Sequence, residues 1–379
     1  MPDELVGAGQ PPGASAPLKD AISLCMSGGG YRAMVFHLGA LLRLNEVGYL
    51  GKLDRISSVS GGSITAGVLA LHWNELGVTP DAPAPRFSIV MDEVRKLAGK
   101  TIDVESILKG LLLPGSVSSK VQADYDAELF HGATLQDLPD SPTFVINATS
   151  VQSAVLFRFT KRYMADYRVG IVNRPRLPLA AAVAASSAFP PVLSPAVIDF
   201  QKYNCVFEPG SGMDLEKEPF TSHAVLTDGG VYDNLGLETV WKTYRTVLVS
   251  DGGGHIAPEG EPHHDWLLHG YRILDLVDNQ VRSLRKRQLI ASYQSGDRSG
   301  TYWGIRTDIS NYEVNSLPCP ADQTLRLAEL PTRLKALSQA EQECLINWGY
   351  AVTDAALRAH VIPGLALPAG FPFARGCRL

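Results

Sequence analysis

One segment of the chain places a serine where a nucleophile would be exposed. Residues 55–67 read as an apolar strand that turns sharply into a helix of small residues, with Ser60 at the corner. A hydroxyl there lies beside the free N–H groups that open a helix, which suits attack on an ester. At such a corner the side chains two residues before and two residues after the nucleophile nearly touch, so both must be small. With Ser60 as nucleophile these residues are Ser58 and Gly62, whereas with Ser63 one of them is the β-branched Thr65. We predict Ser60 as nucleophile; an ordinary serine N-cap is the structural alternative.

A glycine-rich turn could bind a negative charge. Gly28, Gly29 and Gly30 lie between a short buried strand and a helix, so their amides can converge on an anion with the helix dipole behind them. Such a turn suits a nucleotide phosphate or the oxyanion of acyl transfer, and by itself does not decide between them. No Gly-Lys-Ser/Thr follows, and Ala33 stands where a dinucleotide-binding turn needs its third glycine.

A carboxylate could deprotonate the serine. Asp228 ends an apolar strand and is followed by two glycines, and ligands of parallel sheets gather at such strand ends. Asp251 has the same local chemistry and is the competing candidate. Among nine histidines only His255 adjoins a glycine-rich corner, so a Ser-His-Asp triad is the less favoured arrangement.

The composition narrows the class of protein. With 45% hydrophobic and 19% charged residues among 379, the chain is globular, and its net charge of −5 argues against nucleic-acid binding. No apolar run is long enough to span a bilayer, and the N-terminus lacks the order of a signal peptide. Five scattered cysteines indicate reduced thiols. We expect a cytoplasmic protein without metal or cofactor, whose only membrane contact is peripheral, on the inner membrane face.

Repeated strand–turn–helix units predict an α/β fold: three layers, with a mainly parallel central sheet flanked by helices. We expect a loose tail at 1–18, a catalytic domain at 19–310 and a helical C-terminal extension at 311–379 packed on the same domain. The expected strands are at 21–26, 55–59, 143–149, 155–160, 223–227 and 246–250. The expected helices are at 31–47, 62–73, 87–97, 120–130, 178–188, 264–293 and 339–360.

Taken together, these segments resemble the patatin-like phospholipase family. The resemblance rests on four motifs in the family's order, across about residues 20–236: the glycine turn, the Ser60 elbow, residues 184–190 and Asp228-Gly229-Gly230 with Asn234. Ala33 and Ser58 stand where the family usually has glycine, and both are small. The resemblance does not extend to the residues beyond about 300.

The resemblance implies a lipid acyl hydrolase with a Ser60–Asp228 dyad, which explains the missing histidine and favours Asp228 over Asp251. It implies an oxyanion hole from Gly28, Gly29, Gly30 and Gly61, with Arg32 and Asn234 in support. Arg32 could order the glycine turn or hold a phosphate headgroup.

The expected substrate is a glycerolipid or lysolipid, cleaved as by a phospholipase A or lysophospholipase. Residues 107–113 could face an acyl chain, although a core helix explains them as well. The basic residues of 282–287 are better explained as a solvated helix face than as a lipid contact. The alternatives are a soluble Ser-His-Asp carboxylesterase, which would need His255, and a non-catalytic nucleotide-binding module. The oligomeric state is left open.

Overall fold

The central strands bury both of their faces. In β1 (Lys19–Met26), Leu24 and Met26 belong to one hydrophobic cluster, whereas Cys25 belongs to a second. The same alternation runs along β9 (Tyr244–Asp251). Successive side chains of a strand point to opposite faces, so helices must cover the sheet on both sides.

The computed structural model describes residues 17–102, 116–208, 213–254 and 256–378. Within them ten strands form one sheet in the order β10-β9-β1-β2-β3-β4-β5-β6, with β8 paired to β3 and to β7. The strands from β10 to β3 are parallel, and β4 to β8 add antiparallel pairs around them. The remaining strands are β2 (Leu53–Val59), β3 (Thr143–Ser150), β4 (Leu156–Phe159), β5 (Tyr163–Asp166), β6 (Gly170–Asn173), β7 (Ala196–Asp199), β8 (His223–Asp228) and β10 (Ser299–Gly304).

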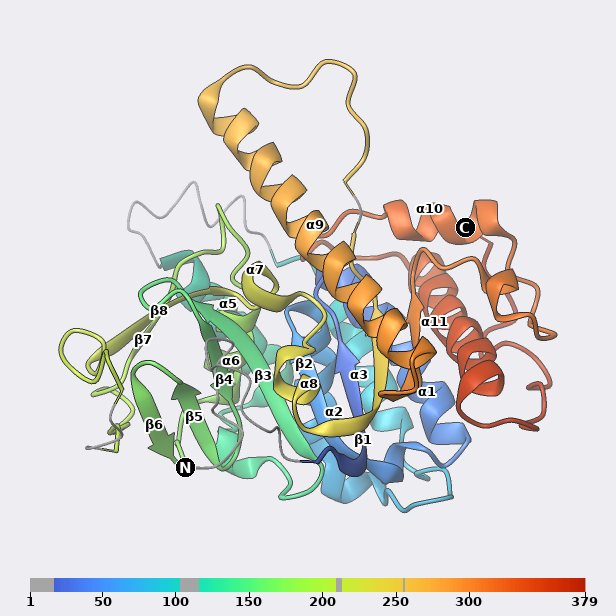
Figure 1. Cartoon of the computed structure of the whole chain (residues 1–379), viewed down its shortest axis with the longest axis horizontal. Helices are drawn as coiled ribbons and strands as arrows, with labels where there is room; N and C mark the ends of the chain where they lie inside the picture. Colours follow the sequence, from blue (N-terminus) through green and yellow to red (C-terminus); the bar gives the residue numbers. More distant parts are fainter. Residues whose placement is uncertain (1–16, 103–115, 209–212, 255, 379) are drawn as a thin grey trace.

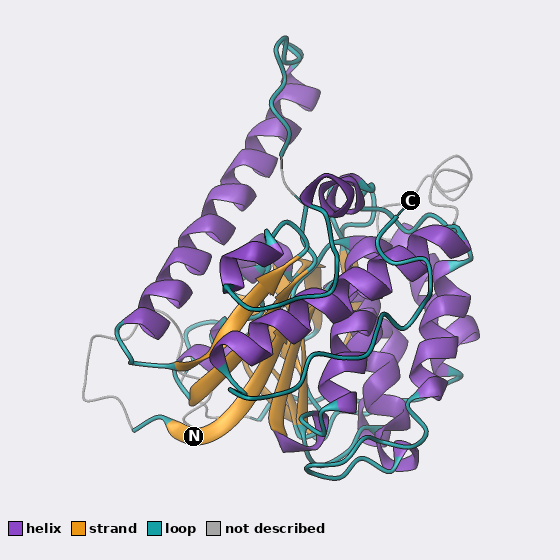
Figure 2. Cartoon of the chain, turned by 90° about the vertical axis from the view of Figure 1, so that its right-hand side faces the viewer, coloured by secondary structure: helices purple, strands orange, loops and turns teal. Residues whose placement is uncertain are grey.

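Helices lie on both sides of this sheet, and one long helix, α9, extends well beyond the rest of the molecule (Figures 1 and 2). The helices are α1 (Gly30–Glu46), α2 (Gly61–Leu76), α3 (Ser88–Ala98), α5 (Ser116–Tyr125), α6 (Leu179–Ser186), α7 (Gly230–Asp233), α8 (Glu238–Trp241), α9 (Trp266–Gln294), α10 (Ala321–Glu329) and α11 (Gln339–His360). The predicted three-layer α/β fold with a mainly parallel central sheet and C-terminal helices is therefore confirmed.

The C-terminal helix α11 packs directly on α1, which begins at the glycine turn. A Cβ added to Gly39 would lie 2.1 Å from the Ile346 carbonyl oxygen, and one added to Gly349 would lie 2.1 Å from that of Phe36. The two backbones therefore approach as closely as glycine allows. The chain after residue 311 thus supports the helix that carries the predicted site.

Some elements differ from the sequence-based expectations. The expected helix at 120–130 is α-helical only to Tyr125 and continues as a π-helical turn over Asp126–Phe130. Strands β5, β6, β7 and β10 and helix α10 were not expected. Three of these strands have four residues, and β10 contains Gly300 and Gly304, so none has the apolar pattern of a buried strand. Residues 1–16 of the expected tail lie outside the described residues.

No helix among the described segments has both the length and the apolar character needed to cross a membrane.

Candidate active site

Ser60 lies at the corner between β2 and α2, in a backbone conformation that serine rarely adopts. Its φ of 52° and ψ of −121° put it outside the helix as the N-cap residue. The next two residues must be small: a Cβ on Gly61 would lie 2.2 Å from the Gly30 carbonyl oxygen, and one on Gly62 would lie 2.6 Å from that of Met26. A strained serine held by close packing is the geometry of a nucleophile elbow.

Ser63 is placed differently. It lies one turn inside α2, is fully buried, and its Oγ is 3.0 Å from Ser58 Oγ and 2.9 Å from Ser186 Oγ. Ser60 keeps 7% of its surface exposed, and its side chain has no hydrogen bond of regular geometry to a described residue. Of the two serines, only Ser60 lies at the mouth of the helix.

The sheet register brings Asp228 next to Ser60. On β3, Asn147 pairs with Val59 of β2, and the following Ala148 pairs with Asp228 of β8. One edge of β3 pairs with β4. The other edge pairs first with β2 and then, beyond the point where β2 ends at Ser60, with β8. The serine and the carboxylate therefore meet where β2 and β8 end.

The Asp228 carboxyl is buried and incompletely paired. Its Oδ1 accepts a hydrogen bond from the Gly230 amide at 2.7 Å, whereas Oδ2 is buried without a hydrogen-bond partner among the described residues. Burial raises the pKa of Asp228 to about 7, although the Gly230 amide and the Ser60 hydroxyl act to lower it. The hydroxyl thus lies close enough to interact with the carboxylate, without a regular hydrogen bond. A carboxyl that titrates near neutrality can exchange a proton with a bound substrate.

Asp251, the competing carboxylate, is fully engaged elsewhere. Its Oδ1 accepts from the Gly253 amide at 2.9 Å and its Oδ2 from the Tyr302 hydroxyl at 2.7 Å. Burial alone would raise the pKa of Asp251, but Arg282 and these hydrogen bonds together lower it below its usual value. Asp251 is a permanently ionised structural carboxylate, whereas Asp228 is poised to change its protonation state.

The glycine turn adjoins Ser60, but one of its amides is already occupied. The Gly28 N–H donates to the side-chain and backbone oxygens of Asn234, at 2.9 Å and 3.2 Å. A Cβ on Gly28 would lie 3.1 Å from Ser60 Cβ, so the turn and the serine are in van der Waals contact. This differs from the expectation that Gly28 offers a free amide: Asn234 takes that amide and thereby fixes the turn.

The amides of Gly29, Gly30 and Gly61 make no hydrogen bond to any described residue. Gly29 and Gly30 have φ angles of 142° and 59°, which favour glycine. A Cβ on Gly30 would also lie 2.9 Å from the backbone of Arg333, so side chains are excluded there. Three unpaired amides therefore lie next to one serine, as a site that binds an anion through backbone N–H groups would require.

Arg32 is buried and bonded to backbone carbonyl groups. Its side chain is 3% exposed and donates to the carbonyl oxygens of Gly252, Ala328 and Leu330. Burial, with the nearby Arg282, lowers the pKa of Arg32 to about 10, so it remains charged at neutral pH. Of its two expected roles, the structure supports ordering of the glycine turn and not headgroup binding.

Among the described residues no histidine hydrogen-bonds to Ser60 or Asp228. The buried His37 lies under the glycine turn, with Nδ1 2.8 Å from Ser250 Oγ and Nε2 2.9 Å from the Ser27 carbonyl oxygen. Burial lowers the pKa of His37 to about 4, so it is neutral and structural. His255, which a triad would need, lies outside the described residues.

Sequence reasoning did not identify the individual contacts by which residues 184–190 join the two halves of the site. Ser186 Oγ accepts from the Ser60 amide at 2.9 Å, and the Ser186 carbonyl oxygen accepts from Gly229 at 3.2 Å. The Ala188 carbonyl oxygen accepts from the Asp228 amide at 3.0 Å. The small side chains around Ser186 were the available signal, since they allow this approach.

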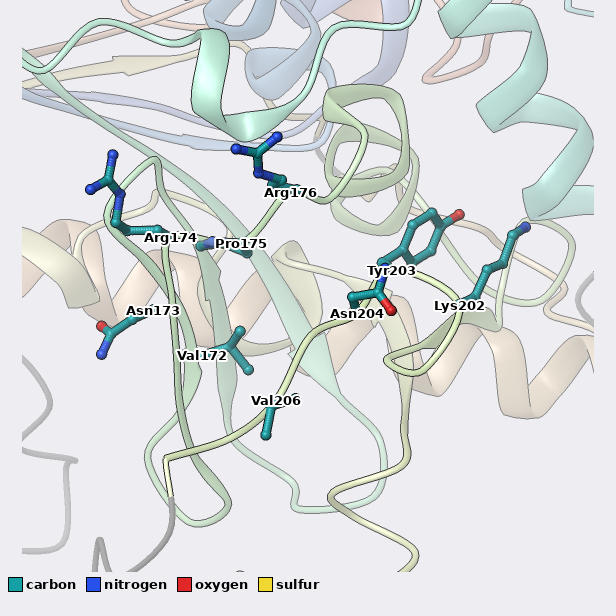
Figure 3. A pocket seen from close by; sticks show the side chains of 9 residues that line it. All are labelled: Val172, Asn173, Arg174, Pro175, Arg176, Lys202, Tyr203, Asn204 and Val206. Atoms are coloured by element: carbon teal, nitrogen blue, oxygen red, sulfur yellow. The ribbon is translucent and has the colours of Figure 1, made fainter.

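A surface cavity of about 510 Å³ lies elsewhere, between the end of β6 and the chain that follows β7 (Figure 3). Its lining includes Arg174, Arg176, Lys202, Tyr203 and Asn204, and neither Ser60 nor Asp228. It holds no nucleophile with an adjacent base, so it is not the candidate active site. Within the described segments no group of three or more His, Cys, Asp or Glu side chains could hold a metal ion.

Comparisons with known proteins agree with this geometry. The family model described as patatin-like phospholipase matches residues 24–241, which is more than half of the chain. The chain belongs to the patatin-like phospholipase family. Its four motifs all lie within the matched region, so the resemblance seen in the sequence is confirmed.

Solved structures show the same fold. A structure of human GIVD cytosolic phospholipase A2 aligns with a TM-score of 0.52 and 11% identity, covering 90% of this chain and 62% of that chain. A second, in complex with methyl gamma-linolenyl fluorophosphonate, aligns with a TM-score of 0.52 and 14% identity, covering 89% and 57%. The chain thus spans about three fifths of these structures. A search of curated protein sequences found no match.

Proposed function

We propose that this patatin-like phospholipase is a lipid acyl hydrolase that cleaves carboxylic esters through a Ser60 acyl-enzyme. The observation that carries the proposal is the buried Asp228, which lies beside the hydroxyl of the strained Ser60. The pKa of Asp228 is about 7, and its Oδ2 has no hydrogen-bond partner among the described residues. A carboxylate near pKa 7 is a far stronger base than free aspartate, near 3.9.

The proposed reaction has two steps. Ser60 Oγ bonds to the ester carbonyl carbon while Asp228 takes the hydroxyl proton, and the leaving alcohol then receives that proton from Asp228. Water next attacks the acyl-enzyme, with Asp228 again as base, which releases the fatty acid and restores Ser60. Each step develops a negative charge on the carbonyl oxygen.

We propose that the free amides of Gly29, Gly30 and Gly61 bind this oxyanion, with Gly28 and Asn234 as the support that holds the turn. One such donor is typically worth about 3–4 kcal/mol of barrier lowering. Close packing supports amides that are positioned before substrate arrives, because Gly61 lies against the Gly30 backbone and Gly30 against that of Arg333.

Two further points rest on the family. We propose a glycerolipid or lysolipid as substrate, since the family is named for phospholipases and the structural relative in complex with a linolenyl fluorophosphonate holds a lipid-like inhibitor. We also propose that the protein acts without a cofactor, because a serine, a carboxylate and amides suffice for the chemistry.

A fluorophosphonate probe tests the nucleophile. We expect the probe to label Ser60, and Ser60→Ala to lose labelling and nitrophenyl-ester hydrolysis, by about 10³-fold or more. Ser63→Ala is the matched control, because Ser63 shares the helix but is buried in a hydroxyl cluster. Full activity in Ser60→Ala, or loss confined to Ser63→Ala, would contradict the assignment. A requirement for His255 would instead indicate a triad esterase.

A further inference from the structure

The protruding helix α9 carries an exposed apolar stripe. Figures 1 and 2 show the N-terminal part of α9 standing clear of the other elements. Large apolar side chains along one side of it are 45–85% exposed. In order they are Trp266 (85%), Ile273 (45%), Leu274 (61%), Val277 (56%) and Leu284 (57%). Their spacing of seven, one, three and seven residues keeps them on one face of the helix. We refer to these five residues as the α9 stripe.

The charges on α9 are sorted around this stripe. Its two acidic residues, Asp275 and Asp278, are partly buried against the body of the molecule. Arg287 is exposed on the flank that borders the stripe on its outer side, and Arg272, on the same side, is partly buried and paired with Glu259. The solvent-facing surface of the helix is therefore mainly apolar, with the cationic Arg287 at its edge.

Acidic residues in the loop before α9 are largely engaged. Glu259 forms an ion pair with Arg272 at 2.7 Å, and Asp265 accepts from the Leu268 amide at 2.8 Å as the helix N-cap. Glu261 is exposed and has no ion pair with a described residue. Glu261 precedes the helix, whereas Arg287 lies in the C-terminal half of α9, so this carboxylate does not pair with Arg287.

The same helix is bonded to the loops of the candidate active site. Asp278, one residue after the stripe's Val277, lies close enough to Asn234, which holds Gly28, for the Asn234 side chain to lower its pKa against the effect of burial. Arg282 donates to the Gly254 carbonyl oxygen beside the glycine turn, and Arg285 lies 3.6 Å from Asp233. These contacts of Arg282 and Arg285 are internal to the protein, so the two arginines are not a free basic face.

We propose that the α9 stripe docks on the surface of an anionic phospholipid bilayer, beside the active site. An apolar stripe with Trp at one end and a cation at its edge has the composition of a helix that lies at the boundary of headgroups and acyl chains. The inference rests on the proposed function, because a lipid hydrolase must reach esters located at that depth. The apolar residues would enter the boundary, and the exposed Arg287 would meet the lipid phosphates.

Vesicle binding by the full chain tests this proposal. Using Ser60→Ala, which leaves the lipid intact, we expect co-sedimentation with vesicles of equal parts phosphatidylcholine and phosphatidylglycerol, and weaker binding to phosphatidylcholine alone. Adding Leu274→Glu and Val277→Glu should weaken binding about tenfold or more, because each places a charge at the apolar boundary. Leu367→Glu is the matched control, being an exposed leucine (44%) away from α9. Equal binding by the stripe variant would overturn the proposal.

Trp266 gives a second, direct measurement. Brominated phospholipid should quench part of the tryptophan fluorescence, and Trp266→Phe should remove that quenching. Of the other four tryptophans, Trp303 and Trp348 are fully buried, Trp73 is 9% exposed, and Trp241 is partly buried with Arg298 over its ring, so none is exposed as Trp266 is. Quenching that persists in Trp266→Phe would contradict docking through α9.

The outcomes also separate docking from catalysis and from self-association. A protein that binds vesicles through the stripe but cleaves no ester would uphold docking and overturn the proposed function. A protein that cleaves soluble esters yet binds no vesicles would uphold the proposed function and overturn docking. A dimer that the two glutamates dissociate, without vesicle binding, would identify a second copy of the chain as the occupant and would reject the lipid surface.

Discussion

At the scale of single residues, the proposed chemistry depends on one carboxyl group that is poorly solvated. Asp228 is buried among the ends of β3 and β8, and a single amide satisfies only one of its oxygens. Burial disfavours the charged form and thereby raises the basicity of the group. The same feature that makes Asp228 a useful base also makes it costly for the fold.

The rate of ester hydrolysis should follow the ionisation of Asp228. The base acts only when ionised, so kcat/KM should rise about tenfold per pH unit below pH 7 and level off above it. Measuring kcat/KM on a soluble ester between pH 5 and 9 checks this. Asp228→Asn should lower the plateau by about 10²–10⁴-fold. Asp251→Asn is the comparison. Loss of rate in that variant alone, with the fold intact, would show that Asp251 and not Asp228 is the base.

Asp228→Asn should also change stability in a pH-dependent way. The folded pKa of about 7 exceeds the unfolded value of 3.8, so the native state holds the proton more tightly. Stability therefore falls as pH rises from about 4 to 7, by up to about 4 kcal/mol in total. The Asn variant lacks this loss and should be the more stable protein at pH 8, but not at pH 4. Thermal unfolding at both values measures the difference, and an Asn variant that is less stable at pH 8 would contradict the argument.

At the scale of elements, the site is an arrangement of helix starts. Helices α1 and α2 begin at the glycine turn and directly after Ser60, so the unpaired amides of both lie in two adjoining turns. The two starts touch: the Gly61 Cα faces the Gly30 carbonyl oxygen at a distance that excludes a side chain. Movement of one helix start must therefore displace the other.

Gly61→Ala should damage catalysis more than its size suggests. The new Cβ would lie 2.2 Å from the Gly30 oxygen, so the glycine turn must shift. Loss of one oxyanion donor lowers kcat by about 10²-fold or more, and the overpacking costs about 1–3 kcal/mol of stability. Gly260→Ala is the matched control, because nothing lies within 4 Å of its position. A Gly61→Ala enzyme with normal kcat would show that this contact is not tight.

Arg32 connects α1 to two distant loops. Its guanidinium donates to Gly252, Ala328 and Leu330, which fixes the glycine turn against the chain that follows β9 and α10. Arg32→Met leaves three carbonyl groups short of a donor, and we expect about 2–4 kcal/mol of lost stability, measured by chemical denaturation. Arg287→Met, on the exposed side of α9, should have little effect. A marginal effect of Arg32→Met would indicate that water replaces the guanidinium.

At the scale of the whole molecule, the C-terminal part of the chain completes the core around the site. Trp348 of α11 is fully buried and donates to the Ile305 carbonyl oxygen at 2.8 Å. Between α11 and α1, Asp354 pairs with Arg43 at 2.8 Å, and both side chains are buried. The domain division at residue 311 stays a prediction, and we propose that 311–379 does not unfold separately from 19–310.

Gly349→Ala tests this coupling. Its Cβ would lie 2.1 Å from the Phe36 carbonyl oxygen, so α11 must move away from α1. We expect a loss of about 2–4 kcal/mol in one cooperative transition that also inactivates the enzyme. Gly370→Ala, with nothing within 4 Å, is the control. Two separate transitions, with activity lost only in the second, would show that the C-terminal part folds independently.

The sequence determined the parts whose signals are local. Neighbouring residues alone indicate the strand–turn–helix units and the serine and aspartate at strand ends. They also indicate the glycine-rich turns, where the backbone has to approach another segment closely. They sufficed to predict the α/β fold and the family. The roles of Ser60 and Asp228 stay predictions that the experiments above test.

Only the tertiary structure decided what distant segments do to one another. Asn234 takes the Gly28 amide across 206 residues, and Tyr302 occupies Asp251 across 51. The stripe on α9 has the spacing of a buried helix face, yet it is exposed. Hydrogen-bond partners and burial depend on which elements the folded chain brings together, and no local pattern in the sequence contains that information.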